Sequence, residues 1–279
     1  MYMGAISALG TAAGTLRRNP IVFVGVFFLS AVGSLTTLGQ VRGGLVVLGT
    51  GLAAFLLSPF LTGGVLGMAE EATAGGTSLS TLLSEGRANY LTLLLATIIQ
   101  FVLFGLVGVL WVIGLLVVLL GGGVALGGIG GGAGAGAAVG IGVVVAVLSV
   151  LVFFLPIYFV QFYDVAIVVS DTGSWGAFKR SFGFVRNHLL SALGYTIIAQ
   201  AINLLVLLPT FWLLYGAPLS LAAVRTAAEQ AAGAATAETL VPLAAVSLVV
   251  GTLVSSLLVT YRVTYYTSLA NDEAGRTAA

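Results

Sequence analysis

The chain has 279 residues, of which 59% are hydrophobic and only 7% carry a formal charge. An average soluble domain has about 25% charged residues, which argues against a water-soluble fold of this length. The net charge of +1 argues against a nucleic-acid partner, because phosphate binding needs an excess of clustered cations. The chain has no cysteine, which excludes disulfides, thiol catalysis and cysteine-bound metals.

Long apolar runs dominate the chain and predict membrane-spanning helices, because about 20 apolar residues in a helix cross the hydrocarbon core. A barrel strand would instead alternate polar and apolar residues over about ten positions. We therefore expect an all-α, polytopic transmembrane helical bundle of six spans. In chain order they are Pro20 to Gly39, Gly43 to Met68, Tyr90 to Leu120, Ala138 to about Val160, Leu189 to Tyr215 and Leu240 to Tyr266.

A short amphipathic segment precedes the first, third and fifth spans. Apolar residues recur every three or four positions in 5–20, 78–90 and 174–188, which makes one apolar face of a helix. Such helices are expected to lie in the plane of the lipid headgroups, with cations at their edges. The candidate headgroup contacts are Arg17, Arg18, Arg87, Lys179, Arg180 and Arg186. Ordinary cytoplasmic connectors are the alternative interpretation.

These segments divide the chain into three repeated units of about 1–70, 71–170 and 171–270, each an interfacial helix followed by a pair of spans. Together they form a single integral membrane domain over 1–270, and 271–279 is expected to be a disordered tail. With the N-terminus inside, eight of the ten Lys and Arg residues lie in the cytoplasm. This distribution predicts a multi-pass protein of the cell membrane with both termini cytoplasmic.

Half of the residues between 119 and 142 are glycine. Gly132, Gly134 and Ala137 match a dinucleotide-binding fingerprint only loosely, and the flanking strand and helix that such a site needs are missing. Glycines also recur every four residues here, which would let a neighbouring helix approach closely. Residues 121–142 are therefore either a loop or a closely packed helix, and glycine's backbone entropy favours the loop.

The stretch "FYDVAIVVSDTGSWGAFKRSFGFVRNHLLSALGYTII" resembles the glycerophosphoryl diester phosphodiesterase membrane-domain family and related six-span prokaryotic proteins of haloarchaeal type. The matching positions are Ala177, Phe178, Lys179, Arg180, Ser181 and Phe182, with Gly76, Ser78 and Leu79 in an earlier segment. The resemblance implies a helical membrane module. It does not imply hydrolase activity, because the family's catalytic half is a separate soluble barrel.

Polar residues inside apolar runs are costly and are therefore candidates for function. They are Asp164, Arg262, Gln100, Gln200 and Asn203. Asp164 and Arg262 fall near the inner ends of the fourth and sixth spans, so we expect an ion pair between them. Gln200 and Asn203 are three residues apart and share a helix face. This spacing favours a structural role, in which they form hydrogen bonds across a helix interface.

The sequence predicts no catalytic, cofactor-binding or metal-binding residues. His188 is the single histidine, so a metal site lacks histidine partners and a serine nucleophile lacks an evident base. We expect a non-enzymatic integral membrane protein. The function that we favour from the sequence is that of a membrane-organising or scaffold module, whose interfacial helices contact lipid headgroups or a partner.

A small-solute transporter or channel-like component is the alternative, because internal repetition is common among transporters. A water-accessible cavity at membrane depth would favour transport, whereas a dry centre would favour the scaffold. Membrane lipids are the expected partners, together with a possible protein partner or a second copy of the chain. No nucleic acid and no cofactor are expected.

Overall fold

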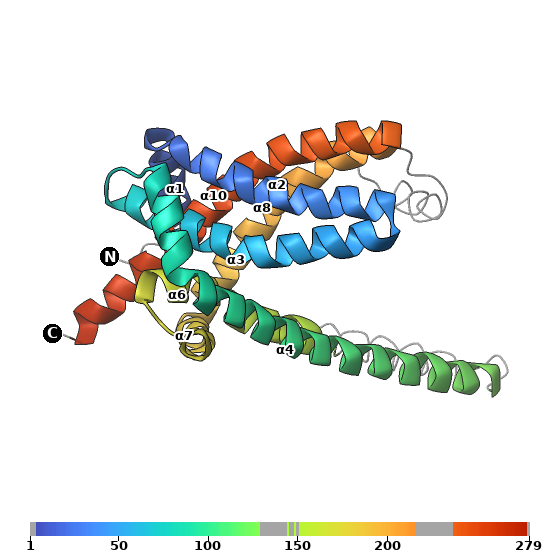
Figure 1. Ribbon diagram of the computed structural model, residues 1–279. Coiled ribbons are helices and arrows are strands. Elements are labelled where there is room, and N and C mark those ends of the chain that lie inside the picture. The colour runs from blue at the N-terminus through green and yellow to red at the C-terminus, as the bar shows by residue number, and fades with distance from the viewer. Residues whose placement is uncertain (1–3, 129–143, 145–147, 149–150, 216–236, 278–279) are drawn as a thin grey trace.

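Four long helices lie side by side and form the main bundle of this computed structural model (Figure 1). They are α2 (Ile21–Arg42), α3 (Gly44–Ala74), α8 (Leu189–Tyr215) and α10 (Ala237–Thr277). The structure describes residues 4–128, 144, 148, 151–215 and 237–277, and these residues form helices and turns without a β-strand. The all-helical class predicted from the long apolar runs is therefore confirmed for the described part of the chain.

Helix α4 (Leu79–Gly128) begins against α3 and then diverges from the main bundle (Figure 1). The helical residues 151–160 run beside its outer half, where the rings of Trp111 and Phe153 lie 5.8 Å apart. This divergence separates the outer half of α4 and residues 151–160 from α8 (Figure 1).

Three short helices gather at the end of the bundle that also holds both chain termini (Figure 1). They are α1 (Ala5–Arg18), α6 (Tyr163–Ser170) and α7 (Ser174–Asn187). Helix α1 meets α2 at 100°, and α7 meets α8 at 103°. At the first of these bends the side-chain amide of Asn19 donates to the carbonyl oxygens of Thr15 and Ala72, which ties the bend to α3.

Four helical stretches in the described ranges are long and apolar enough to cross a membrane: Gly44–Ala74, Leu79–Gly114, Leu151–Ser170 and Leu248–Ala270. The number rises to six if each bent pair, α1 with α2 and α7 with α8, counts as one span. Large apolar side chains such as Leu45 and Phe101 point outward, 84% and 75% exposed, as expected of a surface that faces lipid. These helices indicate a multi-pass membrane protein with four to six spans.

The second amphipathic segment differs from its prediction. Residues 78–90 were expected to form a separate interfacial helix, but α4 runs from Leu79 into the span without a break. The first junction contains Pro20, which cannot continue the hydrogen bonding of α1, whereas residues 88–92 contain no proline or glycine. A repeat of three alike units therefore stays a prediction, since only the first and third junctions have a bend at a break between two helices.

The buried faces of α1 and α7 also differ from the apolar stripes read in the sequence. Ile6 and Trp175 are the first large apolar residues of the predicted stripes in 5–20 and 174–188, but they are 78% and 58% exposed. The buried faces instead combine small residues, which allow close helix contact, with a few large apolar ones. The buried residues are Ala8, Ala12, Thr15 and Leu16 in α1, and Ser174, Ala177, Phe178, Ser181, Phe184 and Val185 in α7.

Two further predictions concern helix ends. Helix α4 includes the first part of the glycine run, up to Gly128, while residues 129–142 lie outside the described ranges. Helix α10 continues to Thr277, so residues 271–277 are helical and not the disordered tail that their polarity predicted.

Candidate functional site

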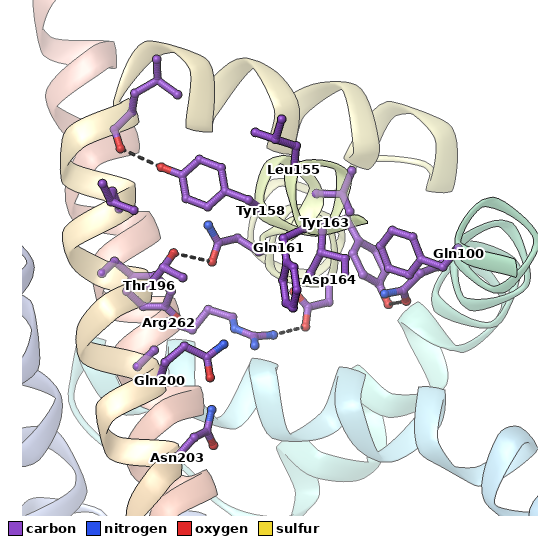
Figure 2. Close-up of a pocket in the computed structure, with 18 of the residues that line it drawn as sticks. Gln100, Leu155, Tyr158, Gln161, Tyr163, Asp164, Thr196, Gln200, Asn203 and Arg262 are labelled. Atoms are coloured by element: carbon purple, nitrogen blue, oxygen red, sulfur yellow. Dashed lines mark hydrogen bonds and ion pairs between the residues drawn. The ribbon is translucent and has the colours of Figure 1, made fainter. Parts of the chain in front are cut away.

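A cavity of about 740 Å³ lies between α4, residues 151–164, α8 and α10 (Figure 2). Its lining includes all five intramembrane polar residues that the sequence singles out: Gln100, Asp164, Gln200, Asn203 and Arg262. They come from four separate segments of the chain. Their convergence on one cavity makes it the candidate functional site.

The ion pair expected between Asp164 and Arg262 is present in this cavity (Figure 2). Arg262 Nη1 donates to Asp164 Oδ2 at 2.6 Å, and Asp164 Oδ1 accepts the backbone N–H of Val165 at 2.9 Å. The Asp164 side chain is 11% exposed, whereas that of Arg262 is 36% exposed. The carboxylate is thus covered and engaged through both oxygens, and the guanidinium is the member of the pair that faces the cavity.

Two more polar contacts on the cavity wall involve residues that the sequence analysis did not single out. The Tyr163 hydroxyl donates to Gln100 Oε1 at 2.6 Å, which joins α6 to α4. The Thr196 hydroxyl donates to Gln161 Oε1 at 3.1 Å, while Gln161 Nε2 is buried without a partner among the described residues. Their proximity to Asp164 in "VQFYDV" is the signal that could have revealed Gln161 and Tyr163.

Gln200 and Asn203 lie deeper along α8 and are exposed to the cavity. Gln200 follows the first residue of α8, Leu189, by eleven positions, which corresponds to about 16 Å along the helix axis. The sequence predicted that these amides would hydrogen-bond across a helix interface. Among the described residues neither amide has a hydrogen bond, and both side chains line the cavity.

A break in the helix at residues 161–162 shapes the wall that carries Asp164. The hydroxyl of Ser181 in α7 accepts the backbone N–H of Phe162 at 3.1 Å and donates to the carbonyl of Phe159 at 2.9 Å. These two bonds satisfy backbone groups that a break would otherwise leave unpaired. Nearby, the Tyr158 hydroxyl donates to the Leu189 carbonyl at 2.7 Å, so residues 151–164 are fixed to the start of α8.

Buried aromatic rings support this wall from the side of the main bundle. Phe162 stacks on Tyr265 with 5.7 Å between ring centroids and lies 5.1 Å from Tyr195 and 5.2 Å from Phe184. All four side chains are at most 5% exposed. This packing joins α7, α8 and α10 and holds Arg262, which neighbours these rings in α10, at the edge of the cavity.

The remaining walls of the cavity are apolar and reach the outer surface. Leu190 is 85% exposed and Phe154 is 58% exposed, although both line the cavity. Other apolar lining residues are Phe104, Leu151, Leu155 and Leu193. The cavity therefore combines a polar part around Arg262 with apolar sides that continue onto the surface of the helices.

The candidate headgroup contacts lie outside this cavity. Arg17, Arg18, Arg87, Lys179, Arg180 and Arg186 are all exposed. Arg180 also donates from Nε to the Tyr266 hydroxyl at 2.9 Å. His188 follows α7 as its C-cap, with its ring 5.2 Å from that of Phe184. Within the described ranges, no three His, Asp or Glu side chains are close enough together to hold a metal ion.

The fold defines a helical, multi-pass membrane protein with a partly polar cavity between its helices. The chain belongs to the family described as Domain of unknown function (DUF7847), whose model matches residues 3–269. No curated protein and no solved structure matches the chain significantly. The match covers all cavity residues but states no activity, so the resemblance to the glycerophosphoryl diester phosphodiesterase membrane-domain family stays a prediction.

Proposed function

We propose that the protein is a non-enzymatic protein of the cell membrane that binds a small molecule in this cavity, as a small-solute transporter does. The observation that carries the proposal is the exposure of Gln200 and Asn203 within the cavity. An amide without a hydrogen-bond partner costs several kcal/mol in hydrocarbon. Two such amides on one face of α8 are therefore expected to meet water or a bound polar group instead of lipid chains.

The charges of the cavity favour binding of a solute over conduction of protons or ions. Asp164 and Arg262 are the charged residues of the lining, and they neutralise each other. Proton relays and ion paths use further ionisable groups along the membrane normal. The described lining has none, so the lining supports a binding site for a solute and not a path for protons or ions.

Cysteine labelling tests whether the cavity is open to polar molecules, and the absence of native cysteine makes single replacements informative. In lipid nanodiscs, Gln200→Cys is expected to react with a small water-soluble thiol reagent. Ile197→Cys, on the same helix and outside the lining, should react at least about tenfold more slowly, because an apolar environment suppresses the thiolate. Equal rates at both positions would contradict a polar cavity.

A second variant tests whether the reagent reaches position 200 through the cavity. Leu193 lines it and is half-exposed, so Leu193→Trp should occupy part of the space and slow the labelling of Gln200→Cys. Leu95→Trp is the matched control, because Leu95 is similarly exposed but lies outside the lining. If the two tryptophans slow the labelling equally, the effect does not come from the cavity.

A membrane-organising role is the second candidate, and the outward face of α7 favours it. Trp175 and Phe182 are 58% and 46% exposed, and Lys179 and Arg186 on the same helix are also exposed. Apolar rings between cations suit a helix that lies among headgroups. We assign this end of the bundle, with both termini, to the cytoplasm. Its partners in this role are membrane lipids, and a protein partner or a second copy of the chain is a further candidate.

Removal of two of these cations should weaken the binding of anionic lipid. The double variant Lys179→Gln/Arg186→Gln of the full chain is expected to lose about 2 kcal/mol of phosphatidylglycerol binding, because each cation near the surface contributes about 1 kcal/mol. Native mass spectrometry of the protein with added lipid measures the loss. Arg42→Gln is the control, because α2 ends there at the opposite end of the bundle. Equal retention of lipid by the unchanged protein, the double variant and Arg42→Gln would contradict this role.

A further inference from the structure

We infer that the ligand of this cavity is an anionic amphiphile, whose carboxylate or phosphate group pairs with Arg262 and whose apolar chain lies against the exposed walls. This inference rests on the proposed binding function and adds the chemical class of the ligand. Three features of the cavity carry it: the orientation of the ion pair, the surplus of hydrogen-bond donors, and the apolar sides.

The orientation of the ion pair gives the cavity a positive end. The Asp164 carboxylate is covered, with one oxygen on Arg262 and the other on a backbone N–H. Arg262 offers five N–H donors, of which one is bonded to Asp164, and its guanidinium also lies beside the Tyr195 hydroxyl. Figure 2 shows the guanidinium reaching from α10 into the cavity. A ligand there meets the cation first and the engaged carboxylate behind it.

Hydrogen-bond donors exceed the bonds that the protein itself makes around this cation. Gln161 Nε2 is buried without a partner in the part of the chain that the structure describes, although its Oε1 is bonded to Thr196. Gln200 and Asn203 add exposed amide groups along α8 (Figure 2). Buried donors are normally paired, so this arrangement is complete only when an acceptor-rich group fills the space. A carboxylate or a phosphate supplies several acceptor oxygens at one place.

The apolar sides distinguish an amphiphile from a free anion. Leu190, Leu193 and Phe154 line the cavity and are also exposed at the outer surface, so an attached chain can leave the cavity between α8 and residues 151–160. An inorganic anion would leave these side chains without an apolar neighbour. Because an amphiphile arrives from the bilayer, its chain is already out of water, and the pairing of its headgroup with Arg262 decides its affinity.

Photo-crosslinking of the full chain in neutral phosphatidylcholine nanodiscs tests the inference. The probe is a photoactivatable palmitate analogue, and the control is the photoactivatable alcohol of the same chain length. We expect the palmitate probe to label peptides from 151–164 and 189–203. Palmitate and hexadecyl phosphate should compete with it, and the better competitor identifies the headgroup. Inorganic phosphate and hexadecanol should not compete.

Two variants separate the headgroup from the chain. Asp164→Asn/Arg262→Gln keeps a polar pair without charge and should reduce palmitate labelling about tenfold, since a charge-assisted hydrogen bond becomes a neutral one. Labelling by the alcohol should not change. Leu193→Trp keeps the charges and should reduce labelling by obstructing the chain, whereas Leu95→Trp should not.

The outcomes distinguish this inference from the binding function beneath it. Equal labelling by palmitate and the alcohol, or full labelling of the uncharged double variant, would overturn the anionic headgroup while cavity binding stands. Competition by inorganic phosphate as strong as that by hexadecyl phosphate would overturn the apolar chain. Absence of cavity labelling by either probe, together with an unreactive Gln200→Cys, would overturn the binding function itself.

Discussion

Replacing Arg262 with glutamine is expected to lower the free energy of unfolding by about 3–5 kcal/mol, the usual cost of leaving one member of a buried ion pair without its partner. The loss is large because the Asp164 side chain is only 11% exposed and depends on Arg262 Nη1, at 2.6 Å, for neutralisation. Unfolding of the purified protein in mixed micelles, by titration with sodium dodecyl sulfate, measures the change.

The reverse replacement, Asp164→Asn, should cost less. The cation that it leaves is 36% exposed to the cavity, where water can solvate it. The double variant Asp164→Asn/Arg262→Gln should recover most of the loss, because it contains no uncompensated charge. Recovery in the double variant is the result that separates an ion pair from two independent contributions.

Arg180→Gln is the matched control for these variants. Arg180 is also an arginine with a hydrogen bond, from Nε to the Tyr266 hydroxyl, but its side chain is exposed in α7. Exposed polar contacts contribute at most about 1 kcal/mol, so its loss should be small. If Arg180→Gln destabilises the protein as much as Arg262→Gln does, or the double variant is no better than the single one, the pair does not hold the structure together.

Much of the architecture follows from the sequence because hydrophobic length alone limits what an apolar run can form. The runs predict helices and a membrane environment, and the structure has helices at each of them within its described ranges. The ion pair between Asp164 and Arg262 could also be predicted. Charges are so rare inside the apolar runs that each has few possible partners, and both fall near the inner ends of their predicted spans.

The cavity could not be predicted in the same way. The three-residue spacing of Gln200 and Asn203 shows that they share a face of α8, but not what lies opposite that face. The space opposite exists because the helix breaks at residues 161–162 and α4 diverges, and both depend on contacts between segments distant in sequence. The Ser181 hydroxyl, which satisfies the backbone at the break, is one such contact.

The sequence pattern also could not predict which face of an amphipathic helix packs against the rest of the protein. In a soluble protein the large apolar residues turn inward, but in a membrane protein lipid is as apolar as the protein interior. Trp175 and Phe182 can therefore face outward while Ala177 and Ser181 allow close packing. The periodicity identifies the helix, but the packed face of α7 holds small residues together with the rings of Phe178 and Phe184.

The same preference for small residues appears where α3 crosses the start of α4. A Cβ added at Gly64 would meet the backbone carbonyl of Leu82 well inside contact distance, and one added at Gly67 would meet the Glu85 side chain. Across the same contact, a Cβ at Gly86 would lie 2.8 Å from the Phe60 carbonyl oxygen. Glycines on both helices thus allow the two backbones to approach.

Gly64→Ala should therefore destabilise the protein by about 1–3 kcal/mol, the cost of overpacking a close contact. The Leu82 carbonyl belongs to the backbone and cannot move without shifting α4. Gly51→Ala is the control on the same helix, because nothing lies within 4 Å of its added Cβ. Its effect should be neutral or stabilising by up to about 1 kcal/mol, from alanine's higher helix propensity. Unfolding in the same mixed micelles measures both variants.

A third glycine decides whether the contact with the backbone is the cause. At Gly67 the nearest neighbours are Cγ and Cβ of Glu85; Cγ can rotate away, whereas Cβ, at 2.7 Å, moves only with the backbone of α4. The loss for Gly67→Ala should accordingly fall between those for Gly64→Ala and Gly51→Ala. Equal losses at all three positions would point to a general effect of alanine in α3, and the close crossing of α3 and α4 would no longer explain the stability of this end of the bundle.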